Sequence, residues 1–92
     1  MKTINDKDLQ NWLVEHEDWQ LVEGEIVLEA EFADFVTAFG FLSSVAILAE
    51  KHGHHPAIEN SYNFVRLRLS THDADGQITD KDLKLAEAID IL

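Results

Sequence analysis

Residues 49–72 read AEKHGHHPAIENSYNFVRLRLSTH, and the pattern of the chain changes from helix to sheet within them. Gly53 can adopt the left-handed conformation that ends a helix, and Pro56 stiffens the connection that follows. Over residues 64–71 apolar and polar side chains alternate with a period of two, which predicts a strand ending with His72 on its polar face. Residues 60–62 predict a shorter strand before it.

The residues before this stretch predict a helix followed by a hairpin. Asn5 is a candidate N-cap for a helix whose apolar residues keep helical spacing until about His16, which we interpret as a helix-end residue. Residues 19–22 and 25–32 indicate two strands joined by a tight turn at Gly24, because glycine can take the positive φ that such a turn requires.

Two more helices complete the predicted fold. From residue 33 to about His52 apolar side chains recur at helical spacing on more than one side, which predicts a long helix that is either fully buried under the sheet or in contact with another subunit. Thr79 and Asp82 have the spacing of a capping box that begins a last helix. We therefore expect one α+β domain over residues 1–92, with the order α-β-β-α-β-β-α and helices on one face of a four-stranded antiparallel sheet.

Composition excludes several function classes. The 92 residues include 18 acidic and 7 basic ones, and a net charge of -11 argues against direct binding to a nucleic-acid backbone. The chain has no cysteine, which removes disulfides, thiolate metal sites and a cysteine nucleophile. No apolar run approaches the roughly 20 residues of a membrane span, so we expect no membrane association and a cytoplasmic location.

Four of the five histidines lie in the opening stretch, and their chemistry is open to three interpretations. Imidazoles this close in sequence could bind a divalent metal ion, or they could be exposed loop residues near the end of a helix. They could also act in general acid–base catalysis, because the unperturbed pKa of histidine, about 6.5, lies near neutrality. Glu50, one helical turn before His54, and the rigid Pro56 favour a fixed acid–base pocket.

Several residues with functional side chains follow one another in a distinctive order: Glu50, His54, His55, Pro56, Tyr62, His72 and Asp82. This order resembles the signature of the pterin-4a-carbinolamine dehydratase family, also known as the dimerization cofactor of a hepatic nuclear transcription factor. The similarity extends over about residues 19–89. Gly53 and Ile58 depart from the residues that the family usually carries, and we assign His52 to the surface.

The resemblance implies an enzyme of tetrahydrobiopterin recycling that converts 4a-hydroxytetrahydrobiopterin, the product left by aromatic amino-acid hydroxylases, to quinonoid dihydrobiopterin and water. It implies that the pterin is the substrate and that neither a metal nor an organic cofactor is needed. His54 and His72 are then expected to form the acid–base pair, while His55 binds and orients the pterin. Glu50 and Asp82 would be supporting carboxylates, with Glu50 holding a histidine in its tautomer.

The wide apolar surface of residues 35–49 also predicts a homodimer or homotetramer, assembled through the central helix or an edge of the sheet. Two alternative functions stay open. One is a non-catalytic dimerization or coactivator module, which would use the apolar helix surface and would not need the histidines. The other is a dehydratase-like protein that acts on another pterin, such as one in molybdopterin metabolism.

Overall fold

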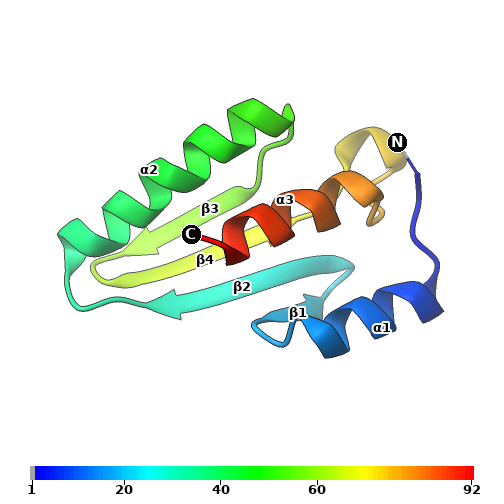
Figure 1. Cartoon of the computed structure of the whole chain (residues 1–92), viewed down its shortest axis with the longest axis horizontal. Coiled ribbons are helices and arrows are strands. Elements are labelled where there is room, and N and C mark those ends of the chain that lie inside the picture. The colour runs from blue at the N-terminus through cyan, green and yellow to red at the C-terminus, as the bar shows by residue number, and fades with distance from the viewer. Residues whose placement is uncertain (1) are drawn as a thin grey trace.

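The computed structural model describes residues 2–92 and contains three α-helices, four strands and one 3₁₀ helix. In chain order these are α1 (Asp6–Glu15), β1 (Trp19–Val22), β2 (Glu25–Glu31), α2 (Phe35–His52), β3 (Ala57–Ser61), β4 (Phe64–Leu69), η1 (His72–Ala74) and α3 (Asp80–Asp90). The strands form one antiparallel sheet in the order β1-β2-β4-β3. The predicted α+β fold and its element order are therefore confirmed (Figure 1).

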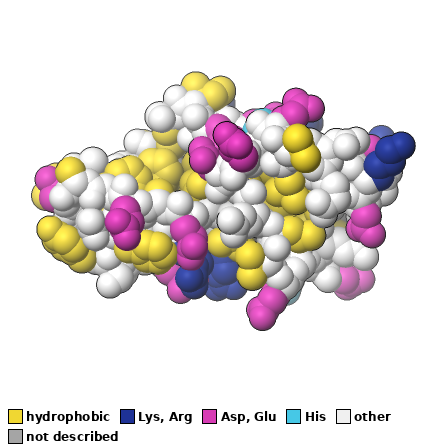
Figure 2. Space-filling model, turned by 90° about the horizontal axis from the view of Figure 1, so that it is seen from below, with side chains coloured by type: hydrophobic (Ala, Val, Ile, Leu, Met, Phe, Trp, Pro, Cys, Tyr) yellow, Lys and Arg dark blue, Asp and Glu magenta, His cyan; other side chains and the backbone are white. Residues whose placement is uncertain are grey.

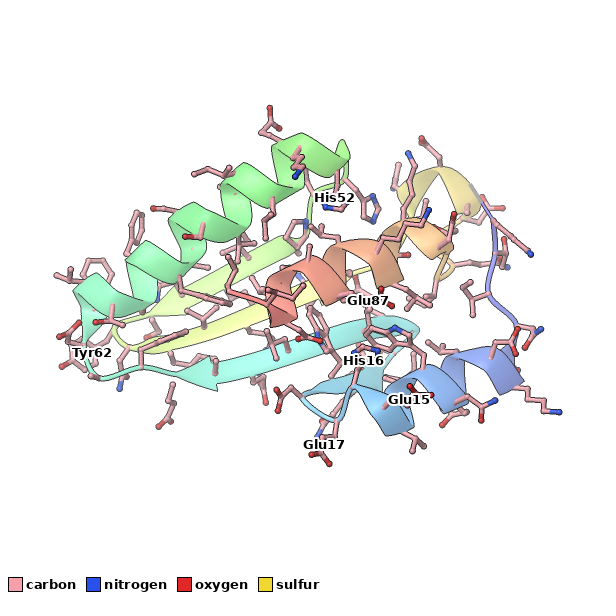
Figure 3. The ribbon with its side chains drawn as sticks, in the orientation of Figure 1. Glu15, His16, Glu17, His52, Tyr62 and Glu87 are labelled. Carbon is pink, nitrogen blue, oxygen red and sulfur yellow. The ribbon has the colours of Figure 1, made fainter. Side chains whose placement is uncertain are left out.

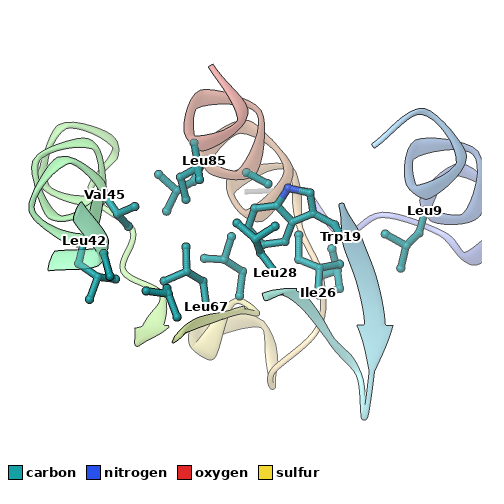
Figure 4. Packing of buried hydrophobic residues seen from close by; sticks show 14 residues of the cluster. Leu9, Trp19, Ile26, Leu28, Leu42, Val45, Leu67 and Leu85 are labelled. Carbon is teal, nitrogen blue, oxygen red and sulfur yellow. The ribbon is translucent and has the colours of Figure 1, made fainter. Parts of the chain in front are cut away.

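The core lies between the sheet and α2 and α3, because β2 and β4 each turn an apolar face toward the two helices (Figure 4). Ile26, Leu28 and Leu67 point from the sheet into this layer, where Val45 of α2 and Leu85 of α3 meet them. All five side chains are buried. Each Å² of apolar surface removed from water stabilises a fold by about 25 cal/mol, so this buried layer is the main source of stability.

The other face of the sheet carries charged residues in cross-strand pairs. Arg66 of β4 pairs with Glu29 of β2 at 2.7 Å, and Arg68 of β4 pairs with Glu25 of β2 at 2.9 Å. Glu59 of β3 approaches both guanidinium groups. Acidic side chains are spread over the surface seen in Figure 2, as the net charge of -11 requires.

Three strands differ from their predicted ranges, by one residue at the end of β2 and by more in β3 and β4. The strand expected at residues 60–62 begins earlier, since the backbone pairs with β4 from Ala57 to Ser61. Tyr62 has a positive φ of 52° and belongs to the turn between β3 and β4. β4 ends at Leu69, so the prediction that His72 ends a strand is wrong.

His72 instead begins η1, because the chain turns sharply at the residue before it. The carbonyl oxygen of Thr71 accepts the N–H groups of Ala74 and Gly76, each at 3.0 Å, and its own N–H is donated to Gln77 at 2.9 Å. These three bonds close a compact turn and leave His72 exposed on its outer side.

The predicted helix ends are confirmed. Asn5 Oδ1 accepts the N–H of Asp8 at 2.8 Å at the start of α1, and Gly53 ends α2 with a φ of 61°. At the start of α3 both bonds of the capping box between Thr79 and Asp82 are present. Each cap satisfies backbone groups that a helix end leaves without a partner.

α2 is buried along one side only, so complete burial under the sheet is contradicted. Leu42 and Val45 face the core, whereas the outward side chains of Val36, Phe39 and Ile47 are 78%, 53% and 70% exposed. An apolar strip formed by these three residues, at positions i, i+3 and i+11 and interrupted by Ser43, thus remains uncovered by the residues that the structure describes.

α1 is attached to α3 through its aromatic residues (Figure 3). Trp12 Nε1 donates to Glu87 at 2.8 Å, and the ring of His16 stacks on Trp12 with centroids 4.2 Å apart. His16 Nδ1 also lies 3.2 Å from the carboxylate of Asp90. His16 is a helix-end residue as predicted, since it is the C-cap of α1, but it also joins two helices.

Candidate active site

The antiparallel pairing of β3 with β4 places the histidines together. Because Ala57 pairs with Arg68, the residues just before β3 lie beside those just after β4. A hollow of about 220 Å³ forms at this end of the sheet, next to the start of α3. Its lining residues come from all three segments: Gly53, His54, His55, Ser70, Thr71, His72, Asp73 and Lys81.

His54 is the most constrained of the three histidines. The left-handed Gly53 reverses the chain, and the N–H of His54 is donated back to the carbonyl of Ala49 at 3.0 Å. The side chain is only 10% exposed, and its Nε2 lies 2.5 Å from Oδ1 of Asp82. The second ring nitrogen, Nδ1, has no hydrogen-bond partner among residues 2–92.

Asp82 is fully buried and uses its two oxygens for different purposes. Oδ2 accepts the backbone N–H of Thr79 at 2.9 Å and the hydroxyl of Thr71 at 2.8 Å, while Oδ1 meets His54. When the carboxylate is ionised it can only accept hydrogen bonds, and His54 Nε2 then carries the proton that lies between the two groups. A carboxylate held in this way fixes both the ring orientation and the tautomer of the histidine.

Glu50 is paired with His55 rather than with His54, through Oε2 and the ring Nε2. Both side chains are mostly exposed, 79% for Glu50 and 63% for His55. An exposed pair of this kind contributes little to stability, because water screens the charges. Pro56 follows with a trans peptide bond and leads directly into β3.

His72 lines the same hollow from the 3₁₀ helix η1. It is exposed, and its ring has no hydrogen-bond partner among residues 2–92. The hollow therefore has one histidine on a buried carboxylate and one that is accessible to water, two environments that suit different proton-transfer roles.

Three residues singled out in the sequence lie away from the hollow. Tyr62 is at the opposite end of β3 and is 65% exposed, and His52 is in the last turn of α2 without lining the hollow (Figure 3). Ile58, 44% exposed, lies on the edge strand.

Residues 2–92 contain no group of three or more histidine and acidic side chains placed to hold a metal ion. Nor is any of their helices long and apolar enough to span a membrane.

The hydrogen bond from the hydroxyl of Thr71 to Asp82 was not predicted from the sequence. In the alternating pattern of residues 64–71, Thr71 falls on the apolar side with Leu67 and Leu69, which suggests simple burial. The signal in the sequence was a hydroxyl residue that ends a row of apolar residues and directly precedes a histidine. Lys81, the one cationic residue among those lining the hollow, was also missed.

Comparisons with known proteins agree over nearly the whole chain. The family model described as "Pterin 4 alpha carbinolamine dehydratase" matches residues 2–92. A relative from Chloroflexus aurantiacus named "Putative pterin-4-alpha-carbinolamine dehydratase" is 46% identical over 98% of this chain and 96% of its own length. One of the same name from Prochlorococcus marinus is 45% identical over 97% and 93%.

A solved structure shares the fold. The crystal structure of a transcriptional coactivator/pterin dehydratase from Brucella melitensis aligns with a TM-score of 0.90 and 34% identity. The alignment covers 97% of this chain and 96% of that one.

Proposed function

Because this chain belongs to the pterin 4 alpha carbinolamine dehydratase family, we propose that it converts 4a-hydroxytetrahydrobiopterin to quinonoid dihydrobiopterin and water. The observation that carries the proposal is the hollow in which His54, His55 and His72 meet, with His54 held on the buried carboxylate of Asp82. An aromatic amino-acid hydroxylase would supply the substrate.

The proposed reaction needs two proton transfers. The C4a–O bond breaks and the hydroxyl leaves as water after it receives a proton, while a ring nitrogen loses its proton and its electron pair forms the new C=N bond. No oxidation or reduction occurs, so acid–base groups suffice without a metal or an organic cofactor. Each such group typically contributes about 10²- to 10⁴-fold to the rate.

The environments of the histidines suggest their roles. His54 Nδ1 would accept the ring proton, because the adjacent Asp82 stabilises the imidazolium that forms. His72, accessible to water, would protonate the leaving hydroxyl and be reprotonated from solvent. His55 would bind and orient the pterin, with Glu50 fixing its ring.

The test is to add the protein to a phenylalanine hydroxylase reaction and to follow the absorbance of the 4a-hydroxypterin. We expect the 4a-hydroxypterin to decay faster with the wild-type protein than it does spontaneously. His54→Ala and His72→Ala should each reduce this acceleration at least about 100-fold. His52→Ala is the matched control, since His52 lies outside the hollow. Decay at the spontaneous rate with the wild-type protein would refute the enzymatic function.

The uncovered strip of α2 favours a second, compatible role in assembly. Val36, Phe39 and Ile47 are exposed on a helix whose other side is buried, so a second copy of this chain or a partner helix would bury them. We expect a homodimer or homotetramer, measured by light scattering at micromolar concentration. A clean monomer would contradict this role, and a variant that lacks His54 should keep any partner binding.

A further inference from the structure

Two buried hydroxyl groups lie behind His54, beyond the carboxylate that it contacts. Thr71 is 3% exposed and Thr79 is fully buried, and their Oγ1 atoms are 2.6 Å apart. Thr79 has a known task, since its side chain caps α3. Thr71 has no such task, yet its hydroxyl is donated to the carboxylate that holds His54.

The hydroxyl protons in this cluster follow from its hydrogen bonds. Thr71 donates its single hydroxyl proton to Oδ2 of Asp82 at 2.8 Å, so it has no proton left for Thr79. The proton between the two hydroxyls must then come from Thr79, whose oxygen in turn accepts the N–H of Lys81 at 3.3 Å. The chain of donors runs from the start of α3 through both threonines and ends on Asp82.

Thr71 is also fixed through its backbone, and the next residue is His72. Its N–H is donated to Gln77, and its carbonyl accepts two N–H groups from the turn that carries η1. The side chain of Thr71 therefore attaches the turn that presents His72 to the carboxylate that orients His54.

We propose that Thr71 is a positioning residue: its hydroxyl, oriented by Thr79, keeps Asp82 directed at His54 Nε2 and holds the turn of His72 beside the same hollow. The expected change in kcat rests on the proposed function. The expected position of the proton on neutral His54, at Nε2, does not depend on any activity. Loss of the hydroxyl would leave Thr79 without its acceptor and Asp82 with one donor fewer on Oδ2.

The experiment compares Thr71→Val, which keeps the shape of the side chain, with Thr71→Ser, which restores the hydroxyl. For Thr71→Val we expect kcat to fall about 10- to 100-fold, the size of effect that removing one hydrogen-bond donor from a buried acceptor typically has, with a change in KM below about threefold. Thr71→Ser should recover most of kcat. Thr3→Val is the control, because exposed Thr3 bridges Thr79 only through its backbone and lies outside the hollow.

The second readout is the ¹⁵N NMR spectrum of the ring of His54 at a pH where it is neutral. We expect the proton on Nε2 in the wild type and in Thr71→Ser, and a mixture of both tautomers in Thr71→Val. A folded Thr71→Val with unchanged kcat and tautomer would overturn the proposal. If that variant does not fold, the wild-type spectrum still decides, because a proton on Nδ1 overturns it. Failure of the proposed function would show separately, as a wild-type protein that does not accelerate dehydration.

Discussion

Asp82→Asn should abolish most of the activity while leaving the fold in place. The amide keeps one oxygen, which the hydrogen bonds from Thr71 and from the backbone of Thr79 will hold at the position of Oδ2. The NH₂ group then faces His54 Nε2 and donates to it. A neutral His54 must in consequence carry its proton on Nδ1, the atom that is proposed to accept a proton from the pterin.

The expected loss follows from the removal of one general base. Such groups contribute about 10²- to 10⁴-fold, which corresponds to about 3 to 5 kcal/mol of transition-state stabilisation at 1.36 kcal/mol per factor of ten. The unfolding free energy should fall by less, about 1 to 2 kcal/mol, because the two bonds to Oδ2 survive and only the charge-assisted bond to His54 changes. Such a loss shifts the Tm of a small domain by roughly 4 to 16 °C.

The assay is the coupled decay of the 4a-hydroxypterin, together with a thermal melt and the ¹⁵N spectrum of His54. Asp8→Asn is the matched control, since Asp8 has the same position in α1 that Asp82 has in α3 and lies outside the hollow. If Asp82→Asn folds and keeps wild-type kcat, or if the proton of His54 stays on Nε2, the reasoning about the carboxylate is wrong.

Three further outcomes follow from the same geometry. Glu50→Gln should lower kcat by less than about tenfold and leave Tm nearly unchanged, because the pair with His55 is exposed; a loss as large as that of Asp82→Asn would contradict this ranking. Phe39→Asp should yield monomers in light scattering, since it places a charge in the uncovered strip of α2, and intact oligomers would exclude this strip as the interface. The N–H of Thr37 lowers the pKa of Asp34, so this cap stabilises the fold above the ordinary aspartate pKa of about 3.9 and less as the pH falls through the lowered value. Asp34→Ala should therefore lower Tm at pH 7, and the difference in Tm from the wild type should become smaller below about pH 4. Asp34→Asn should retain the cap. A difference in Tm that does not change with pH would refute this role of Asp34.

Local signals were sufficient for most of the fold. The Asn5 and Thr79 caps, the Gly53 helix end and the period of the apolar residues are interactions between neighbours in sequence, so they are visible without a structure. The extent of β3 was not, because Ala57 is held in the sheet by its partner on β4 rather than by its own alternation. The turn before His72 likewise depends on bonds to one carbonyl oxygen that no side-chain pattern encodes.

The candidate site shows the same division. The chain order brought His54, His55 and His72 to attention, and the structure places all three around one hollow. Which carboxylate serves which histidine could not be predicted. Glu50 is four residues from His54, yet Gly53 turns the chain so that the carboxylate in contact with His54 is Asp82, 28 residues away. The chemical roles of these histidines and carboxylates are predictions, which the variants above will test.

The contacts of α1 and β1 with α3 make the intrinsic fluorescence of this chain a local probe. Trp12 of α1 donates to Glu87, and Trp19, the first residue of β1, donates to Asp90 at 2.9 Å. Emission from the two indoles will therefore follow the detachment of α1 and of the start of β1 from α3, with His16 stacked on Trp12. A fluorescence melt and a melt followed by an NMR signal from the histidine hollow will coincide only if the two ends of the domain unfold together.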